Sequence, residues 1–220
     1  MWFVEHLYDK ARDAAGEIVA SVGIDATQWD ALERRIDLEN VKTMGVSADR
    51  FPTSCVQAYE LLVHRQGGSV DGTTLGLIWS AASSALLEVA PIAPDSEWVI
   101  STLKSCGDVV LLTKGDPGIQ TKRLEESGLA SLFDAVFVVP EKSDAEFRMV
   151  LKKMQRVPDE SWSVGNSLAS DINPALRLGM HCIWIEAHVW EHELRELETV
   201  SDSVIRAESL ALVPGIIRHG

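Results

Sequence analysis

The sequence predicts an α/β fold in which helices cover both faces of a parallel sheet, joined to a separate all-helical domain. Residues 4–90 show only helical periodicity, whereas from residue 108 short apolar runs alternate with amphipathic helices. These runs are apolar on both faces, which is typical of parallel strands that are covered from both sides. We therefore expect a helical domain over residues 4–90 and an α/β core over residues 91–220.

The helical domain is expected to contain four helices. Apolar residues at helical spacing predict them over Phe3–Val22, Trp29–Val41, Thr53–Arg65 and Thr73–Val89. The third ends at a pair of glycines, which favour helix termination. The fourth carries almost no charge, so we expect it to be buried.

The core alternates between strands and helices. A proline-containing linker leads to a helix that Asp95 or Ser96 caps and that runs to Ser105. The predicted strands are 108–113, 135–139, 162–164 and 182–185, and the predicted helices between them are 117–126, 143–154 and 168–178. Ser209–Val213 is a candidate for one last strand.

Composition excludes several kinds of partner. The net charge of -13 argues against a nucleic-acid backbone or an anionic membrane as partner, because both require clustered Lys and Arg. The three cysteines are odd in number and widely spaced, which predicts neither a disulfide framework nor a zinc site. The sequence shows no secretory signal and no membrane-spanning run, so we expect a cytoplasmic protein.

Polar residues follow three of the predicted strands. Thr113 ends the first, Lys142 follows the second, and Asn166 and Asp171 follow the third. The carboxyl ends of parallel strands meet at one edge of a sheet, where ligands usually bind. A hydroxyl group can hold a phosphoryl oxygen, a lysine can neutralise charge that develops there, and a carboxylate can hold Mg²⁺. The set predicts part of an anion-transfer site.

Each of these residues also has an ordinary structural explanation. Thr113 could simply end a strand, Lys142 could be a surface cation, and Asp171 could stabilise a helix N-terminus. The pair His188 and His192 has the spacing of a metal site on a helix, but a third ligand is lacking and exposed polar residues are the better interpretation. The ordered set, rather than any single residue, supports the site.

Three motifs of this set resemble those of a known superfamily. Leu-Leu-Thr-Lys-Gly-Asp, Pro-Glu-Lys-Ser and Gly-Asn-Ser-Leu-Ala-Ser-Asp-Ile-Asn-Pro-Ala-Leu-Arg-Leu-Gly-Met are similar to motifs two, three and four of the haloacid dehalogenase-like (HAD) hydrolases. The resemblance implies a Rossmann-like core with a helical cap at residues 4–90. It also implies a Mg²⁺-dependent phosphatase that acts on a small phosphorylated molecule.

The resemblance also assigns roles to individual residues. Thr113 and Lys142 would be catalytic, Asp171 and Asn166 would hold Mg²⁺, and Lys114 and Gly115 would bind substrate. In relatives with all four motifs, the first-motif aspartate would attack the phosphate ester and form an aspartyl-phosphate.

The first motif of the superfamily, Asp-x-Asp-x-Thr at the end of a strand, does not occur in the sequence. Met1-Trp2-Phe3-Val4 resembles the segment that follows it, as if translation began too late. We expect the 220-residue chain to be inactive or nearly so. The motif's strand lies in the middle of the sheet, so its loss predicts two unpaired edges that favour association into a homo-oligomer. An upstream segment, a partner chain or a rearranged strand would fill the space.

Two alternatives remain open. A 2-haloacid dehalogenase also has an asparagine before the fourth-motif aspartate and needs no metal, but Thr113-Lys114-Gly115 favours the phosphatase because dehalogenases tend to have Ser-Asn-Gly there. A non-catalytic phosphate-binding module would explain the absent nucleophile, although such a module has no evident need for Lys142 and Asp171.

Overall fold

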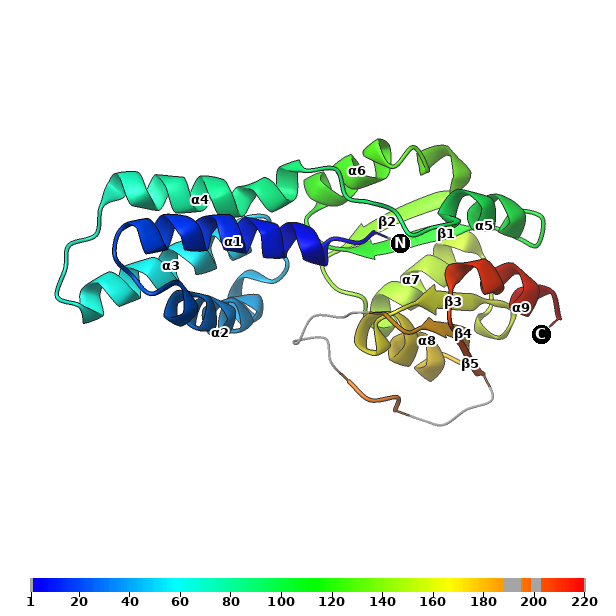
Figure 1. Ribbon diagram of the computed structural model, residues 1–220. Helices are drawn as coiled ribbons and strands as arrows, with labels where there is room; N and C mark the ends of the chain where they lie inside the picture. The colour runs from blue at the N-terminus through cyan, green and yellow to red at the C-terminus, as the bar shows by residue number, and fades with distance from the viewer. Residues whose placement is uncertain (1, 188–194, 199–202, 220) are drawn as a thin grey trace. The chain divides into compact units, whose positions relative to one another are not determined.

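A computed structural model describes residues 2–187, 195–198 and 203–219 of the protein. It divides into two compact units, Trp2–Pro91 and Ile92–Gly220 (Figure 1). The first is all-helical and the second contains all the described strands. The predicted fold class, a parallel-sheet α/β core with an additional helical region, is confirmed.

Four helices make up the first unit, and their bounds are α1 Glu5–Ser21, α2 Ala26–Met44, α3 Arg50–Arg65 and α4 Gly72–Leu87. Helix α1 packs against α4, and α2 packs against α3. Two of the helices begin at side-chain caps: Asp25 accepts the N–H group of Thr27 at 2.8 Å, and Asp71 accepts that of Thr74 at 2.7 Å. These caps satisfy amide groups that a helix N-terminus otherwise leaves without partners.

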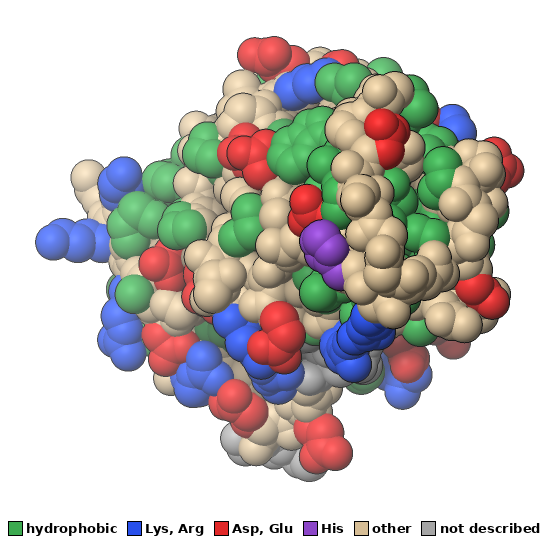
Figure 2. Space-filling view, turned by 90° about the vertical axis from the view of Figure 1, so that its left-hand side faces the viewer, with side chains coloured by type: hydrophobic (Ala, Val, Ile, Leu, Met, Phe, Trp, Pro, Cys, Tyr) green, Lys and Arg blue, Asp and Glu red, His purple; other side chains and the backbone are tan. Residues whose placement is uncertain are grey.

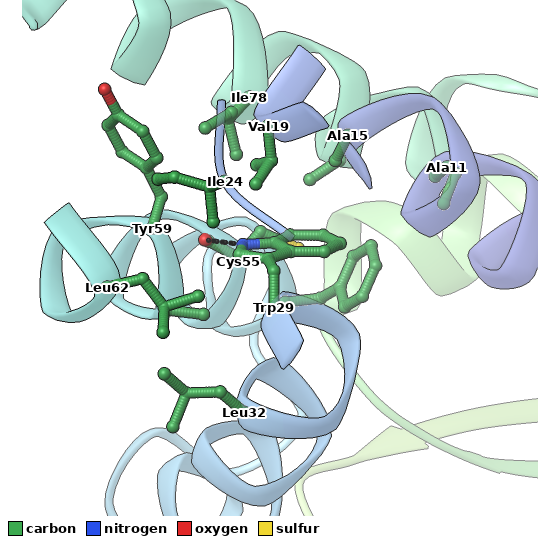
Figure 3. Close-up of a cluster of buried hydrophobic side chains, with 14 of the residues drawn as sticks. Ala11, Ala15, Val19, Ile24, Trp29, Leu32, Cys55, Tyr59, Leu62 and Ile78 are labelled. Carbon is green, nitrogen blue, oxygen red and sulfur yellow. Dashed lines mark hydrogen bonds between the residues drawn. The ribbon is translucent and has the colours of Figure 1, made fainter. Parts of the chain in front are cut away.

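A buried tryptophan lies at the centre of this helical unit. Trp29 is 1% exposed, and its Nε1 donates a hydrogen bond to the backbone oxygen of Cys55 at 3.1 Å (Figure 3). Ala15, Val19 and Ile78 lie around it in the same core, each of them fully buried. The hydrogen bond satisfies the one polar atom of the indole, so the whole ring can be buried without an unpaired donor.

The expected burial of the fourth helix is wrong for about half of its surface. Ile78, Ala82 and Ala85 face the core, but Leu77 and Leu87 are 53% and 71% exposed. In a bundle of this size, a surface helix buries one stripe only, so the absence of charge does not require burial of the other faces. Apolar side chains reach the surface among charged ones on the face shown in Figure 2.

The second unit alternates helices and strands as the sequence predicts. Its longer helices are α5 Ser96–Leu103, α6 Pro117–Glu126, α7 Asp144–Met154 and α9 Val213–His219, with a short α8 at Asn173–Arg177. Its strands are β1 Val110–Lys114, β2 Ala135–Val139, β3 Trp162–Gly165, β4 His181–Ile185 and β5 Val204–Ala207. Short 3₁₀ turns occupy Ala130–Leu132, Pro158–Glu160 and Leu210–Leu212.

The strands form two separate parallel sheets within this unit. Strand β1 pairs with β2, with Leu111 opposite Val136, while β3, β4 and β5 form a second sheet in that order. Among the described residues, no strand joins β1 to β3. The sheet is therefore interrupted between the two halves that carry the predicted site.

Two predicted elements differ from the structure. Ser209–Val213 is not a strand, because a 3₁₀ turn leads there into α9, and Pro214 fits the first turn of a helix but cannot complete a strand ladder. The last described strand is β5, at Val204–Ala207. The helix predicted over 168–178 begins instead as a π-helical turn, Leu168–Ile172, in which the Ile172 amide donates to the Ser167 carbonyl at 3.2 Å.

Other expectations concern single residues and the membrane. Each of the three cysteines is a free thiol, and Cys55 and Cys182 are buried. His188 and His192 lie outside the described residues. Across the described part of the chain, no helix combines the length and the apolar character needed to cross a bilayer.

Candidate active site

The predicted site residues lie at the carboxyl ends of the parallel strands. Thr113 and Lys114 are the last residues of β1, and Lys142 lies in the turn after β2. Asn166 directly follows β3, and Asp171 lies within the π-helical turn. Parallel pairing aligns these ends within each sheet, and the contacts of Lys114 with Ser170 and of Lys142 with Asp171 bring the ends of the two sheets together.

Lys142 and Asp171 form a close ion pair across the interruption between the two sheets. Lys142 Nζ lies 2.5 Å from Asp171 Oδ1, and the two side chains are only 16% and 12% exposed. The other carboxylate oxygen, Oδ2, accepts the Ser167 amide at 3.0 Å. Burial raises the pKa of Asp171, but the Lys142 charge and these hydrogen bonds outweigh it and hold that pKa below its usual range. Asp171 is therefore ionised at neutral pH.

The Asp171 side chain rests directly on the backbone of Gly165. A β-carbon added at Gly165 would overlap the Asp171 carboxyl group and would lie 2.5 Å from Asp171 Cβ. Real β-carbons do not approach other atoms this closely, so only glycine allows the carboxylate to reach Lys142 from this turn. Gly165 thus determines where the charge lies.

Lys114 reaches the same turn from the end of β1. Its Nζ lies 3.1 Å from Ser170 Oγ, and the Ser170 amide donates to Ser167 Oγ at 3.1 Å. Two ammonium groups therefore meet the turn from Ser167 to Asp171, although the two lysines come from different strands. Ser167 lies in the turn between the predicted third strand and its helix, where the sequence predicts that ligands bind, whereas no sequence pattern indicates Ser170.

Thr113 and Gly115 make contacts with helix α6 and strand β2. The buried Thr113 hydroxyl donates to Gln120 Oε1 at 3.1 Å. Gly115 has a φ of +148°, and a β-carbon there would lie 2.5 Å from Gln120 Nε2. The Gly115 amide donates to the Val139 carbonyl at 3.0 Å and so continues the pairing of β1 with β2. In this structure both residues shape the turn after β1.

Asn166 is linked to the neighbouring strand through its backbone. Its carbonyl oxygen accepts a hydrogen bond from Trp184 Nε1 at 3.0 Å. Trp184 lies in β4, and the guanidinium carbon of Arg206 is 5.2 Å from the centre of its ring. These contacts connect the turn after β3 to the interior of its sheet.

The described residues do not make a complete Mg²⁺ site. Mg²⁺ requires about six oxygen ligands in octahedral geometry and is commonly held by one or two carboxylates, substrate phosphates and waters. Here Asp171 is the carboxylate of the site, and both of its oxygens already accept hydrogen bonds. Within the described ranges, no group of three or more His, Cys, Asp or Glu residues is placed to hold a metal.

The fold matches solved structures of known hydrolases. A haloacid dehalogenase-like family hydrolase from Xanthomonas campestris superposes with a TM-score of 0.80 at 21% identity, covering 100% of this chain and 90% of that one. The chain has the haloacid dehalogenase-like fold. This result confirms the predicted resemblance at the level of the fold. A 2-haloacid dehalogenase from Pseudomonas syringae pv. tomato superposes with a TM-score of 0.66 at 16% identity, covering 100% and 94% of the two chains.

At the level of sequence, the chain matches a known protein over only part of its length. A phosphoserine phosphatase from Thermus thermophilus is 30% identical over 102 residues, which are 44% of this chain and 41% of that protein. The match thus spans less than half of that relative. No protein-family model matches the chain.

Proposed function

We propose that this site binds the phosphoryl group of a small phosphate monoester, as part of a HAD-type phosphoric monoester hydrolase. The observation that carries the proposal is the convergence of Lys114 and Lys142 on the turn from Ser167 to Asp171. Two ammonium groups beside the carboxyl ends of parallel strands suit a dianionic group. Similarity to a phosphoserine phosphatase supports the same substrate class.

Each residue of the site would have a separate role in binding the phosphoryl group. Lys142 would neutralise charge on the phosphoryl oxygens while its ion pair with Asp171 keeps its ammonium group in position. Lys114 would bind a second phosphoryl oxygen, and the Thr113 hydroxyl would turn from Gln120 toward the ligand. The helical unit would act as the cap that selects the rest of the substrate.

Mg²⁺ is the cofactor that we expect of such a hydrolase, and Asp171 with Asn166 would be its ligands in this chain. Those two residues are too few to hold the ion without oxygens from elsewhere. The sequence also contains no Asp-x-Asp, the source of the expected nucleophile. We therefore expect the 220-residue polypeptide to bind phosphate but to turn over very little ester.

The test compares binding with turnover. Inorganic phosphate at about one hundred times its dissociation constant should stabilise the protein by about 2.7 kcal/mol, which is a rise of several degrees in Tm. Hydrolysis of p-nitrophenyl phosphate, with and without Mg²⁺, should stay near background. Lys114→Ala should lose the stabilisation by phosphate, whereas Lys122→Ala, which removes a lysine on α6, should retain it. Equal stabilisation of both variants would contradict the assignment of the site, and robust turnover would contradict the expected inactivity.

A 2-haloacid dehalogenase is the second candidate. Both oxygens of Asp171 are engaged by Lys142 and Ser167, and this arrangement suits a reaction that needs no metal. Chloride release from 2-chloropropionate in the presence of EDTA, without hydrolysis of phosphate esters, would favour this candidate. The protein would be a non-catalytic binding module if phosphate stabilises it but neither p-nitrophenyl phosphate nor 2-chloropropionate reacts.

A further inference from the structure

Gln120 lies beside the proposed phosphoryl site, near the start of helix α6. Asp116 caps this helix by accepting the Ile119 amide at 3.1 Å, and the Gln120 amide donates to the Asp116 carbonyl at 2.9 Å. These contacts fix the Gln120 backbone shortly after the end of β1. The side chain reaches back to that strand end, because Thr113 Oγ1 donates to Gln120 Oε1 at 3.1 Å.

Both partners of this side-chain hydrogen bond are buried. Thr113 is 8% exposed and Gln120 is 7% exposed. The Gln120 amide also lies against the backbone of Gly115, where an added β-carbon would meet Nε2 at 2.5 Å and Cδ at 3.2 Å. Water therefore has little access to either polar group, and a hydrogen bond that one of them gives up must be replaced within the protein or by the ligand.

The present hydrogen bond conflicts with the binding of a phosphoryl group. The Thr113 hydroxyl has a single hydrogen atom to donate, and it donates that atom to Gln120. A dianionic phosphoryl group only accepts hydrogen bonds, so Thr113 must release Gln120 before it can bind one. Gln120 Oε1 would then face the lone pairs of the Thr113 oxygen. Two acceptors at this distance repel each other, and at a buried position the repulsion opposes binding.

Rotation of the Gln120 amide removes this conflict. A glutamine side chain carries an acceptor oxygen and a donor NH₂ group of nearly equal size, so the space that holds one orientation also holds the other. After a half-turn, Nε2 would take the position of Oε1 and donate to Thr113 Oγ1. Thr113 would then accept from Gln120 and donate to the ligand, and both buried groups would retain a partner.

We propose that Gln120 is a positioning residue of the phosphoryl site, whose side-chain amide holds the Thr113 hydroxyl in the free protein and rotates on binding to release it toward a phosphoryl oxygen. The inference rests on the proposed function, because it requires that the site takes a phosphoryl group. Among side chains of this length, glutamine alone offers both an acceptor and a donor without a charge. Ionised glutamate offers only acceptors, and methionine offers only a weak one.

Isothermal titration calorimetry with inorganic phosphate measures the dissociation constant of the full 220-residue chain at mildly alkaline pH, where the ion is mostly dianionic. Gln120→Glu should weaken binding about tenfold, which corresponds to about 1.4 kcal/mol, because a carboxylate holds the hydroxyl and cannot donate to it. Gln120→Met should weaken binding less, since methionine neither holds nor orients the hydroxyl. Gln155→Glu, which adds the same charge at an exposed position of the same unit, should bind like the natural protein.

Thr113→Val separates positioning from packing and from charge. If Gln120 acts through the hydroxyl, the loss caused by Gln120→Met should disappear in the Thr113→Val background. The loss caused by Gln120→Glu should shrink there to the part that its negative charge contributes. Equal losses with threonine and with valine at position 113 would show that Gln120 acts only by packing or charge, and would refute the proposal. A Gln120→Met variant that binds more weakly than Gln120→Glu would also refute it.

The rotation itself can be followed by NMR of side-chain amide groups. The Gln120 NH₂ resonance, assigned by its loss in Gln120→Met, should move when phosphate is added to the natural protein and stay in place in Thr113→Val at saturating phosphate. A resonance that does not move in a protein that binds phosphate would refute the rotation. Failure of the natural protein to bind phosphate would contradict the proposed function and this inference with it, whereas binding that is independent of Gln120 would contradict this inference alone.

Discussion

Replacement of Lys142 by methionine tests whether the buried ion pair governs the stability of the core unit. The substitution keeps most of the side-chain volume but leaves the Asp171 carboxylate, 12% exposed, without its cation. Removal of one partner of a buried ion pair typically lowers the free energy of unfolding by about 3–5 kcal/mol. A matched exposed pair is available in Lys104 and Asp134, whose atoms lie 2.9 Å apart with side chains 36% and 33% exposed. Lys104→Met should cost about 0–1 kcal/mol.

The dependence on pH should change sign in Lys142→Met. In the natural protein the pKa of Asp171 is lowered, so the stability that it contributes is present above the ordinary carboxyl pKa and is lost as the pH falls through the folded value. Without Lys142, burial dominates and the pKa of Asp171 rises above its ordinary value. The contribution of Asp171 to the stability of the variant should then increase as the pH falls from 7 toward 4, whereas in the natural protein that contribution is unchanged over this range and is lost only at lower pH.

Urea denaturation at pH 7 and pH 5 provides the measurement, with hydrogen exchange of β3 and β4 reporting on the core unit. Lys142→Met/Asp171→Asn should recover part of the loss, because the double substitution removes the uncompensated charge. Equal costs for Lys142→Met and Lys104→Met, or no recovery in the double variant, would refute the reasoning.

Two further predictions concern the glycine under the carboxylate and a buried acid of the helical unit. Gly165→Ala should lower the free energy of unfolding by about 1–3 kcal/mol and displace Asp171. Gly107→Ala should change it very little, because an added β-carbon there meets no atom within 4 Å. Similar urea midpoints for the two variants would contradict this prediction. Burial raises the pKa of Glu33 to about 7 from 4.5, although Arg12 lies 2.8 Å away, so stability should fall by about 3 kcal/mol as the pH rises from 4.5 to 7. Glu33→Gln should remove that decline, and Asp30→Asn, at an exposed position near Arg12, should retain it; thermal denaturation across this range checks both.

Local chemistry was sufficient to predict most of the elements. Helix α6 begins at Pro117 after the cap Asp116 and ends at Glu126, as expected, because proline suits the first helical turn and Asp116 accepts the Ile119 amide. Strand β2 has its predicted bounds for a similar reason, since its five apolar residues stand between polar turns. The order of these elements also placed Thr113, Lys142 and Asp171 at one sheet edge.

The details of the site depend on contacts between residues far apart in the chain. Lys114 and Ser170 are separated by 56 positions, and Lys142 and Asp171 by 29. No local pattern reveals that a carboxylate will lie against Gly165. The π-helical turn also depends on such contacts, because the sequence from Leu168 onward by itself favours an ordinary α-helix.

The sequence by itself determined most of the element types, the parallel-sheet class and the edge at which the polar residues gather, because each of these depends on periodicity and on residues close together in the chain. Only the tertiary structure decided which groups are buried and which charges meet. It buries Glu33 beside Arg12 and exposes Leu77 on an uncharged helix. It also leaves the gap between β1 and β3, because burial and strand pairing are properties of the packed chain as a whole.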